Sequence, residues 1–178
     1  MKVTEKHVLF WGSVFSNWAT ARFVVDGNEF RTSEQYFMYM KAKTFKDEEI
    51  AQEILKYGTN PKEAKKLGRK VKNYDDAVWN VKRYDIMYDA IKYKFDANPQ
   101  MKEELMSYHG KSFVEASPYD KVWGIGICED DAEADDESMW KGTNLLGKAL
   151  TELRDHYEFT NIVNSIDGDF RQGWCTDI

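Results

Sequence analysis

The sequence predicts a single α+β domain over residues 1–178, mostly helical with a small β-sheet. Hydrophobic residues make up 42% of the chain and aromatic residues 15%, which indicates a folded globular protein. A chain of 178 residues can bury one sizeable core. Helix-capping signals and apolar residues at helical spacing recur along the chain, whereas the segments of strand character are short. The sequence shows no repeat and no linker, so one domain is expected.

The first thirty residues predict the strands. Residues 7–11 form a short apolar run typical of a strand, and a loop over residues 12–17 follows it. Residues 22–25 and 28–31 flank Asp26-Gly27, a pair that favours the tight turn of a β-hairpin.

Helices are predicted from capping signals and apolar spacing. Thr32-Ser-Glu-Gln35 is a capping-box pattern, and both Asn60-Pro61 and Asn98-Pro99 place a cap before a proline in the first turn. The predicted helices span residues 32–45, 46–57, 61–68, 75–95, 99–108 and 144–157. The tail over residues 158–178 shows no clear pattern and is left unassigned.

The segment over residues 113–127 combines a carboxylate, an aromatic ring and glycine, which has no side chain. Residues 113–114 and 122–127 are predicted to be short strands, and Asp120 would lie at a strand mouth close to Trp123. Gly124 has no Cβ, so a ligand or another backbone segment can approach it closely. The segment suits a base with a sugar attached, and the alternative is a tight turn with a core tryptophan.

The negative charge is concentrated in one place. The formal net charge is −6, but residues 129–137 hold seven acids, without which 24 acidic residues would face 25 basic ones. This balance argues against tight non-specific binding to a nucleic-acid backbone. The acidic run lacks the glycine and ligand spacing of a calcium-binding EF-hand, and a solvated loop is expected there.

Other features of the composition argue against several classes of protein. Two cysteines make no disulfide framework, and three histidines show no metal-ligand spacing, so we expect neither a metal nor a cofactor. No run of eighteen apolar residues and no signal peptide is present, so no membrane association is expected. A cytoplasmic protein is the expectation, and the sequence indicates no oligomeric state.

Two predicted helices carry polar side chains on one face. Glu34 and Lys41 lie seven residues apart, so an acid and an amine share a face. Trp79 and Arg83 lie four residues apart and also share a face. Each pattern has a plain structural alternative, a solvated ion pair for the first and the edge of a core for the second.

Seven sequence blocks, in order from about residue 8 to Arg154, resemble the NADAR (YbiA-like) family. The blocks are Phe15-Ser-Asn17, Thr32-Ser-Glu-Gln-Tyr-Phe-Met-Tyr-Met-Lys41-Ala, Ala64-Lys-Lys-Leu-Gly-Arg69, Trp79-x3-Arg83-x3-Met87, Lys94-Phe95, Glu115-Ala-Ser-Pro-Tyr-Asp120-x2-Trp123-Gly-Ile-Gly and Gly142-Thr-Asn-Leu-Leu-Gly147-Lys. The chain departs from the family pattern at Asn80, where members often have Asp, and in its acidic run.

The resemblance implies an N-glycosidase. Members of the family hydrolyse ribosylaminopyrimidine phosphates, which are intermediates of riboflavin synthesis, or remove ADP-ribose from the amino group of guanine. The implied partner is therefore a small nucleotide-like substrate or ADP-ribosylated guanine in nucleic acid. The rival functions are a module that binds ADP-ribose without cleaving it and a metal-dependent phosphoesterase that uses the acidic loop.

The resemblance, taken together with residue chemistry, gives candidate site residues. The expected catalytic residues are Glu34, Lys41 and Asp120. The expected substrate-binding residues are Asn17, Arg69, Trp79, Arg83, Trp123, Gly124 and Asn144.

The chemistry suits these residue types. A carboxylate stabilises positive charge that develops on the sugar, and a second acid of raised pKa protonates the leaving nitrogen. Indole rings stack on the base, and either predicted arginine can hold a phosphate by a bidentate contact. A lysine amine offers a covalent route through a Schiff base with the opened sugar. The sequence does not choose between direct hydrolysis and the lysine route, although an amino-linked sugar, which opens readily to an imine, favours the lysine.

Overall fold

The structure, a computed structural model, describes the backbone of residues 1–172 and the side chains of residues 1–166. It confirms the α+β class. A small sheet has the strand order β1 (Lys2–Val3), β2 (His7–Phe10), β5 (Ser112–Glu115). The first pair of strands is antiparallel, and β2 runs parallel to β5. Two segments more than 100 residues apart in the sequence are thereby joined edge to edge.

The predicted hairpin is present as β3 (Phe23–Val25) and β4 (Asn28–Phe30). Asp26 and Gly27 at its turn both have positive φ, +50° and +78°. That pair of angles is the one which a two-residue turn between right-twisted strands requires, and it explains the Asp-Gly signal.

Within residues 1–172 the helices follow the capping signals closely. They are α1 (Ser33–Thr44), α2 (Glu48–Tyr57), α3 (Pro61–Gly68), α4 (Asp76–Ala97), α5 (Pro99–Met106) and α6 (Leu145–Gln172). The Thr32 side chain accepts a hydrogen bond from the Gln35 backbone N–H, as the capping-box prediction requires. Residues 132–135 and 137–139 add two short 3₁₀ turns.

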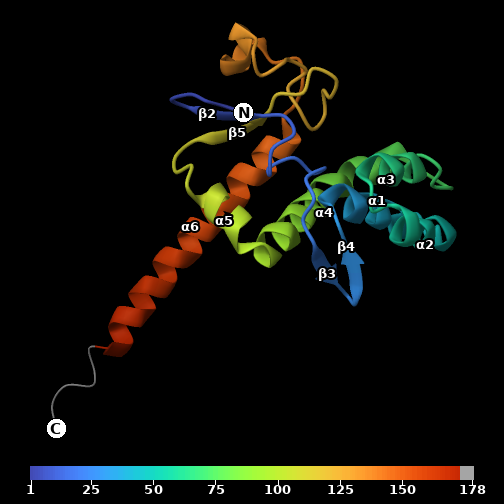
Figure 1. Ribbon diagram of the computed structural model, residues 1–178, viewed down its shortest axis with the longest axis horizontal. Coiled ribbons are helices and arrows are strands. Elements are labelled where there is room, and N and C mark those ends of the chain that lie inside the picture. The colour runs from blue at the N-terminus through green and yellow to red at the C-terminus, as the bar shows by residue number, and fades with distance from the viewer. Residues whose placement is uncertain (173–178) are drawn as a thin grey trace.

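The helices and the sheet form two parts of the molecule. Helix α1 packs against α2, α3 and α4, while α6 packs against β5 and α4. Figure 1 shows the group of α1 to α4 on one side and the β2–β5 sheet on the other, with α6 running past both. The loop between β2 and β3 and the segment after β5 lie where these two parts meet.

The β2–β5 sheet is buried on both faces. Val8, Phe10 and Phe113 point into the main core with the helices, whereas Leu9 and Val114 point into a smaller core on the other side. This alternation follows from the two-residue period of a strand.

The acidic run covers the smaller core. Ala134 is fully buried there, and its carbonyl accepts a hydrogen bond from the Trp140 indole N–H at 2.9 Å. The buried His7 ring contacts Asp135 at 2.7 Å. The expectation of a solvated loop therefore holds only in part: six of the seven acids are exposed, but Glu129 is partly buried and Ala134 is packed onto the sheet.

The predicted strand over residues 122–127 is also wrong. The segment is irregular, and its backbone hydrogen bonds are scattered, for example from Ile125 N–H to the Glu115 carbonyl and from Lys141 N–H to the Ile125 carbonyl. Gly126 has φ +70°, which interrupts an extended strand.

The unassigned tail continues a helix. Helix α6 runs on to Gln172, and its C-terminal half projects away from the rest of the molecule (Figure 1). Residues 173–178 lie outside the described residues. Among the described residues, no helix combines the length and apolar character needed to cross a membrane.

A buried lysine fixes the loop between β2 and β3. Lys94 on α4 is fully buried, and its ammonium group donates to the carbonyls of Val14 and Ser16 at 2.5 and 2.9 Å. Burial lowers the pKa of this amine to about 7. The loop has no strand partner, so the lysine supplies hydrogen bonds that a sheet would otherwise provide.

We expect Lys94→Met to lower the free energy of unfolding by about 1–3 kcal/mol, because a buried carbonyl loses its donor while the volume of the side chain is kept. Chemical denaturation measures this change. The matched control is Lys82→Met on the exposed surface of the same helix. Equal stabilities of the two variants would show that the buried amine does not hold the loop.

Candidate active site

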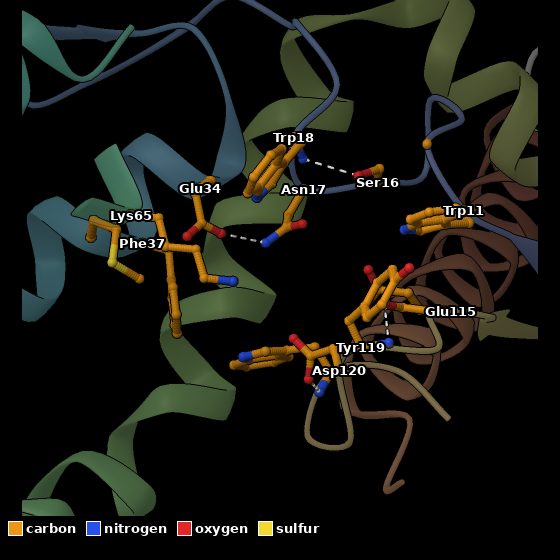
Figure 2. A pocket seen from close by; sticks show the side chains of 14 residues that line it. Trp11, Ser16, Asn17, Trp18, Glu34, Phe37, Lys65, Glu115, Tyr119 and Asp120 are labelled. Carbon is orange, nitrogen blue, oxygen red and sulfur yellow. Dashed lines mark hydrogen bonds between the residues drawn. The ribbon is translucent and has the colours of Figure 1, made fainter. Parts of the chain in front are cut away.

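A cavity of about 490 Å³ opens where the two parts of the fold meet. Its walls come from the loop after β2, from α1, from α3 and from the segment after β5, so no single motif builds it. The lining residues are Trp11, Gly12, Ser16, Asn17, Trp18, Glu34, Phe37, Met38, Lys65, Glu115, Ser117, Tyr119, Asp120 and Trp123. Figure 2 shows Glu34, Asn17 and Trp18 on one side of the cavity, facing Tyr119 and Asp120 on the other.

Glu34 lies in the first turn of α1 and is 3% exposed. Asn17 holds it in two ways: the amide nitrogen of the Asn17 side chain donates to Glu34 Oε2 at 2.7 Å, and the Asn17 carbonyl accepts from the Glu34 backbone N–H at 2.9 Å. Burial raises the pKa of Glu34 to about 7, although the nearby Lys65 charge opposes the rise. Glu34 therefore exchanges a proton near neutral pH.

Glu115 ends strand β5 and is also buried. Burial raises its pKa to about 8, and the charges of Asp120 and Glu34 add to the rise. Glu34 Oε1 and Glu115 Oε2 are buried and have no hydrogen-bond partner among the described residues. Two carboxyl groups with raised pKa and unpartnered oxygens thus belong to one cavity.

Asp120 follows β5 in a tight turn that its own side chain stabilises. Asp120 Oδ1 accepts hydrogen bonds from the backbone N–H groups of Val122 and Trp123, both at 2.8 Å. These bonds fix the carboxylate at the cavity wall. The half-buried Trp123 ring next to it packs edge-on against Phe37, with the ring centroids 5.2 Å apart.

Aromatic rings form much of the remaining wall. Trp11, Trp18 and Tyr119 are 51%, 42% and 86% exposed, and Trp11 and Tyr119 lie with their ring centroids 6.1 Å apart. Large exposed rings around acidic groups suit a flat base joined to a polar sugar.

The structure brings together four of the predicted site residues. Glu34, Asp120, Asn17 and Trp123 all line the cavity. Their segments are separated by up to about 100 residues in sequence, and the junction of loop, α1 and post-β5 turn unites them.

Other predicted residues lie outside the cavity. Lys41 is half-buried against Tyr74, with its Nζ 4.3 Å from the ring centroid, and burial lowers its pKa. Trp79 is buried behind Phe37, with the ring centroids 5.0 Å apart, and is not among the residues that line the cavity; its substrate-binding role stays a prediction. Arg69 lines a neighbouring hollow, whereas Arg83 lines neither.

Gly124 and Asn144 support the site from behind. A Cβ on Gly124 would lie 2.7 Å from the Glu115 carbonyl oxygen, so the glycine admits another backbone segment and not a ligand. The Asn144 side chain accepts from the Glu115 N–H and donates to the Phe113 carbonyl, both at 3.0 Å. Its role in the structure is to hold β5.

Sequence reasoning missed several lining residues. Glu115 belonged to the quoted sequence block but was not counted as catalytic, and Lys65 belonged to the block around Arg69. Their burial and direction depend on packing between distant segments. The exposed aromatic residues Trp11, Trp18 and Tyr119 carried only a weak signal: Trp11 ends a predicted strand, Trp18 follows the predicted loop over residues 12–17, and Tyr119 directly precedes Asp120.

Comparison with known proteins identifies the family, because the NADAR domain matches residues 9–158. The chain belongs to the NADAR family. It is 44% identical over 129 residues to "Protein irg-1" of Caenorhabditis elegans, covering 71% of this chain and 60% of that protein. It is 36% identical over 165 residues to "N-glycosidase R617" of Acanthamoeba polyphaga mimivirus, and the match covers 85% of this chain and 96% of that protein.

A solved structure also supports the assignment to the NADAR family. The NMR structure of the Escherichia coli protein YbiA superimposes with a TM-score of 0.73 at 26% identity and covers 90% of each chain. The NADAR relationship confirms the predicted family and fold. The names of its relatives support the predicted class of enzyme, an N-glycosidase.

The raised pKa of Glu115 gives a prediction for stability. Its folded-state value is about 8 against an ordinary 4.5, so the folded protein keeps a proton that the unfolded chain releases between these values. The stability contributed by the neutral form is therefore fully present below about pH 4.5 and lost as pH rises through about 8. Glu115→Gln stays neutral, so its free energy of unfolding relative to wild type should rise with pH, by at most about 1.4 kcal/mol per pH unit. Denaturant unfolding of both proteins at about pH 5, 7 and 9 measures this difference. A difference in free energy of unfolding that stays the same at all three pH values would contradict the prediction.

Proposed function

We propose that this protein is an N-glycosidase that hydrolyses the bond between a ribosyl group and a nitrogen of a base. The observation that carries the proposal is the pair of buried carboxyl groups, Glu34 and Glu115, with pKa values of about 7 and 8 in one aromatic-walled cavity. The proposed substrates are ADP-ribosylated guanine and the ribosylaminopyrimidine phosphates of riboflavin synthesis.

Direct hydrolysis needs two kinds of acidic group. Cleavage of the sugar–nitrogen bond develops positive charge on the anomeric carbon, which the fixed Asp120 carboxylate stabilises. The leaving nitrogen takes a proton from a carboxylic acid that is still protonated near neutral pH, a role that suits Glu34 or Glu115. A water molecule then adds its oxygen to the anomeric carbon and releases a proton to a carboxylate.

A lysine route uses the same cavity. When the base is joined through an amino group, the sugar ring opens to an imine between that nitrogen and C1. A neutral lysine amine adds to C1 and expels the base as its amine, which leaves a lysine imine. Water hydrolyses the imine, the lysine amine is restored, and the free sugar closes. The sequence analysis assigned this role to Lys41, whereas among the described residues it is Lys65 that lines the cavity.

The direct test is incubation with ADP-ribosylated guanosine and with a ribosylaminopyrimidine phosphate, reading the released base by mass spectrometry. We expect one of them to be cleaved by the wild-type protein. Asp120→Asn and Glu34→Gln should each reduce turnover by about a hundredfold or more, the usual scale for a positioned acid or base. Asn at position 120 can still accept both backbone hydrogen bonds, so the turn should be kept.

One outcome would count against this function and another against the role of Asp120. Tight binding of either compound without release of base would indicate a binding module. Turnover of Asp120→Asn within about threefold of wild type would remove Asp120 from the mechanism, since general catalysis contributes far more than this.

The two lysines are distinguished by reductive trapping. Borohydride added during turnover should reduce an imine to a stable adduct, with the protein heavier by the sugar fragment. We expect the modification on Lys65, so that Lys65→Arg abolishes the adduct and lowers turnover by about a hundredfold. Lys41→Arg is the matched control. An adduct on Lys41 would restore the sequence-based prediction, and the absence of any adduct would favour direct hydrolysis.

A further inference from the structure

A second hollow of about 750 Å³ adjoins the active-site cavity. It shares Trp18 and Lys65 with that cavity, and Lys65 Nζ lies 5.8 Å from the Trp18 ring centroid. The second hollow and the active-site cavity therefore meet at Lys65 and Trp18. Figure 2 shows both side chains beside Glu34. The residues lining the second hollow are Trp18, Lys62, Glu63, Lys65, Lys66 and Arg69.

One face of α3 supplies the cations. Lys62, Lys65, Lys66 and Arg69, called here the α3 stripe, lie at positions i, i+3, i+4 and i+7, which share one face of a helix. The opposite face is anchored in the core, where Gly68 packs so closely that an added Cβ would lie 2.1 Å from the sulfur of Met38. Met38 also lines the active-site cavity, so the position of the α3 stripe relative to the cavity is fixed.

The positive charge of this stripe is largely uncompensated. The one acid among the residues that line the second hollow, Glu63, pairs with Lys66 at 3.4 Å. Among the described residues, no carboxylate lies within 4.0 Å of the cationic groups of Lys62, Lys65 or Arg69. A cluster of four cations is notable in a chain of net charge −6, and it lies next to a cavity that contains three acids. Such a surface attracts an anion.

We propose that the α3 stripe binds a phosphate group carried on C5 of the ribosyl substrate, an inference that rests on the proposed function. With the sugar beside Glu34 and Asp120, its C5 substituent leaves the cavity past Lys65 and Trp18. Arg69 holds the phosphate with a planar fork of donors, and Lys62 adds a second positive charge, while Lys65 lies at the boundary between the two hollows. The phosphate is either the single group of a ribosyl phosphate or the diphosphate of an ADP-ribosyl group.

A small anion fits the α3 stripe better than a nucleic-acid backbone does. From Lys62 to Arg69 the helix rises only about 10 Å, the length of a few phosphates at most. The acidic run over residues 129–137 would also repel a long polyanion. The ligand is therefore a substrate phosphate, and binding of an oligonucleotide is an alternative for the test.

The experiment measures binding of ribose, ribose 5-phosphate and ADP-ribose by calorimetry, with NMR titration for weak ligands. We expect both phosphorylated ligands to bind at least about tenfold tighter than ribose, the scale of one charge-assisted hydrogen-bonded contact. Arg69→Gln and Lys62→Gln should weaken them about five- to tenfold and leave ribose unchanged. Lys82→Gln, an exposed cation outside both hollows, is the matched control.

The outcomes are separate from those of the hydrolysis assay, because none of these ligands contains the bond to be cleaved. If Arg69→Gln and Lys62→Gln lose more affinity for ADP-ribose than for ribose 5-phosphate, the bound group is the diphosphate. If they lose the same affinity for both ligands, the bound group is a single phosphate.

Equal affinity of the wild-type protein for ribose and ribose 5-phosphate would overturn the proposal. A loss of phosphate-ligand affinity in Arg69→Gln no larger than that in Lys82→Gln would also overturn it. An unmodified oligonucleotide that binds more tightly than ADP-ribose in an Arg69-dependent way would overturn it in favour of a nucleic-acid surface. If phosphate binding depends on the α3 stripe while no N-ribosyl compound is cleaved, the proposed function fails and the phosphate site stands.

Discussion

The position of one cavity wall depends on a single buried amine. The Lys94 ammonium group donates to two carbonyls of an irregular loop, and the next residue of that loop, Asn17, holds Glu34 through its side chain and its carbonyl. Burial of a lysine is unfavourable without such acceptors. The loop therefore needs the lysine for its hydrogen bonds, and the lysine needs the loop for its acceptors. Helix α4 in this way fixes the direction of a carboxyl group on α1.

The opposite wall uses an amide side chain in the same manner. Asn144 adopts φ +52°, a left-handed conformation that asparagine tolerates better than most residues, and clamps the end of β5 at Phe113 and Glu115. An added Cβ on Gly147 would lie 2.1 Å from the Phe113 carbonyl oxygen, so α6 must approach β5 closely. The raised pKa of both Glu34 and Glu115 is thus chiefly a result of burial in a rigid frame, since neither carboxyl group has an ion-pair partner among the described residues.

Local signals predicted the fold better than they predicted the site. The capping box, the Asp-Gly turn and the helical spacing of apolar residues act over a few residues, so the sequence shows them directly. Same-face spacing of Glu34 and Lys41 was correct, but spacing does not show what covers that face, and Tyr74 lies against the lysine. Lys65 reaches the cavity because α3 packs on α1. The Val122-to-Ile127 segment had strand composition, yet strand formation also needs an edge to pair with and compatible φ angles at its glycines.

The charges of the two hollows act on one another at Lys65. Its positive charge lowers the pKa of Glu34, against the larger effect of burial. A phosphate bound at the α3 stripe would offset part of that positive charge, so the Glu34 pKa would rise further and its neutral acid form would be favoured. The anion that anchors the substrate would in this way help to protonate the group beside the bond to be cleaved. The cationic helix face therefore orients a ligand by its anionic end. The same bound anion favours the protonated form of Glu34 in the acidic cavity, where the other end of the ligand lies.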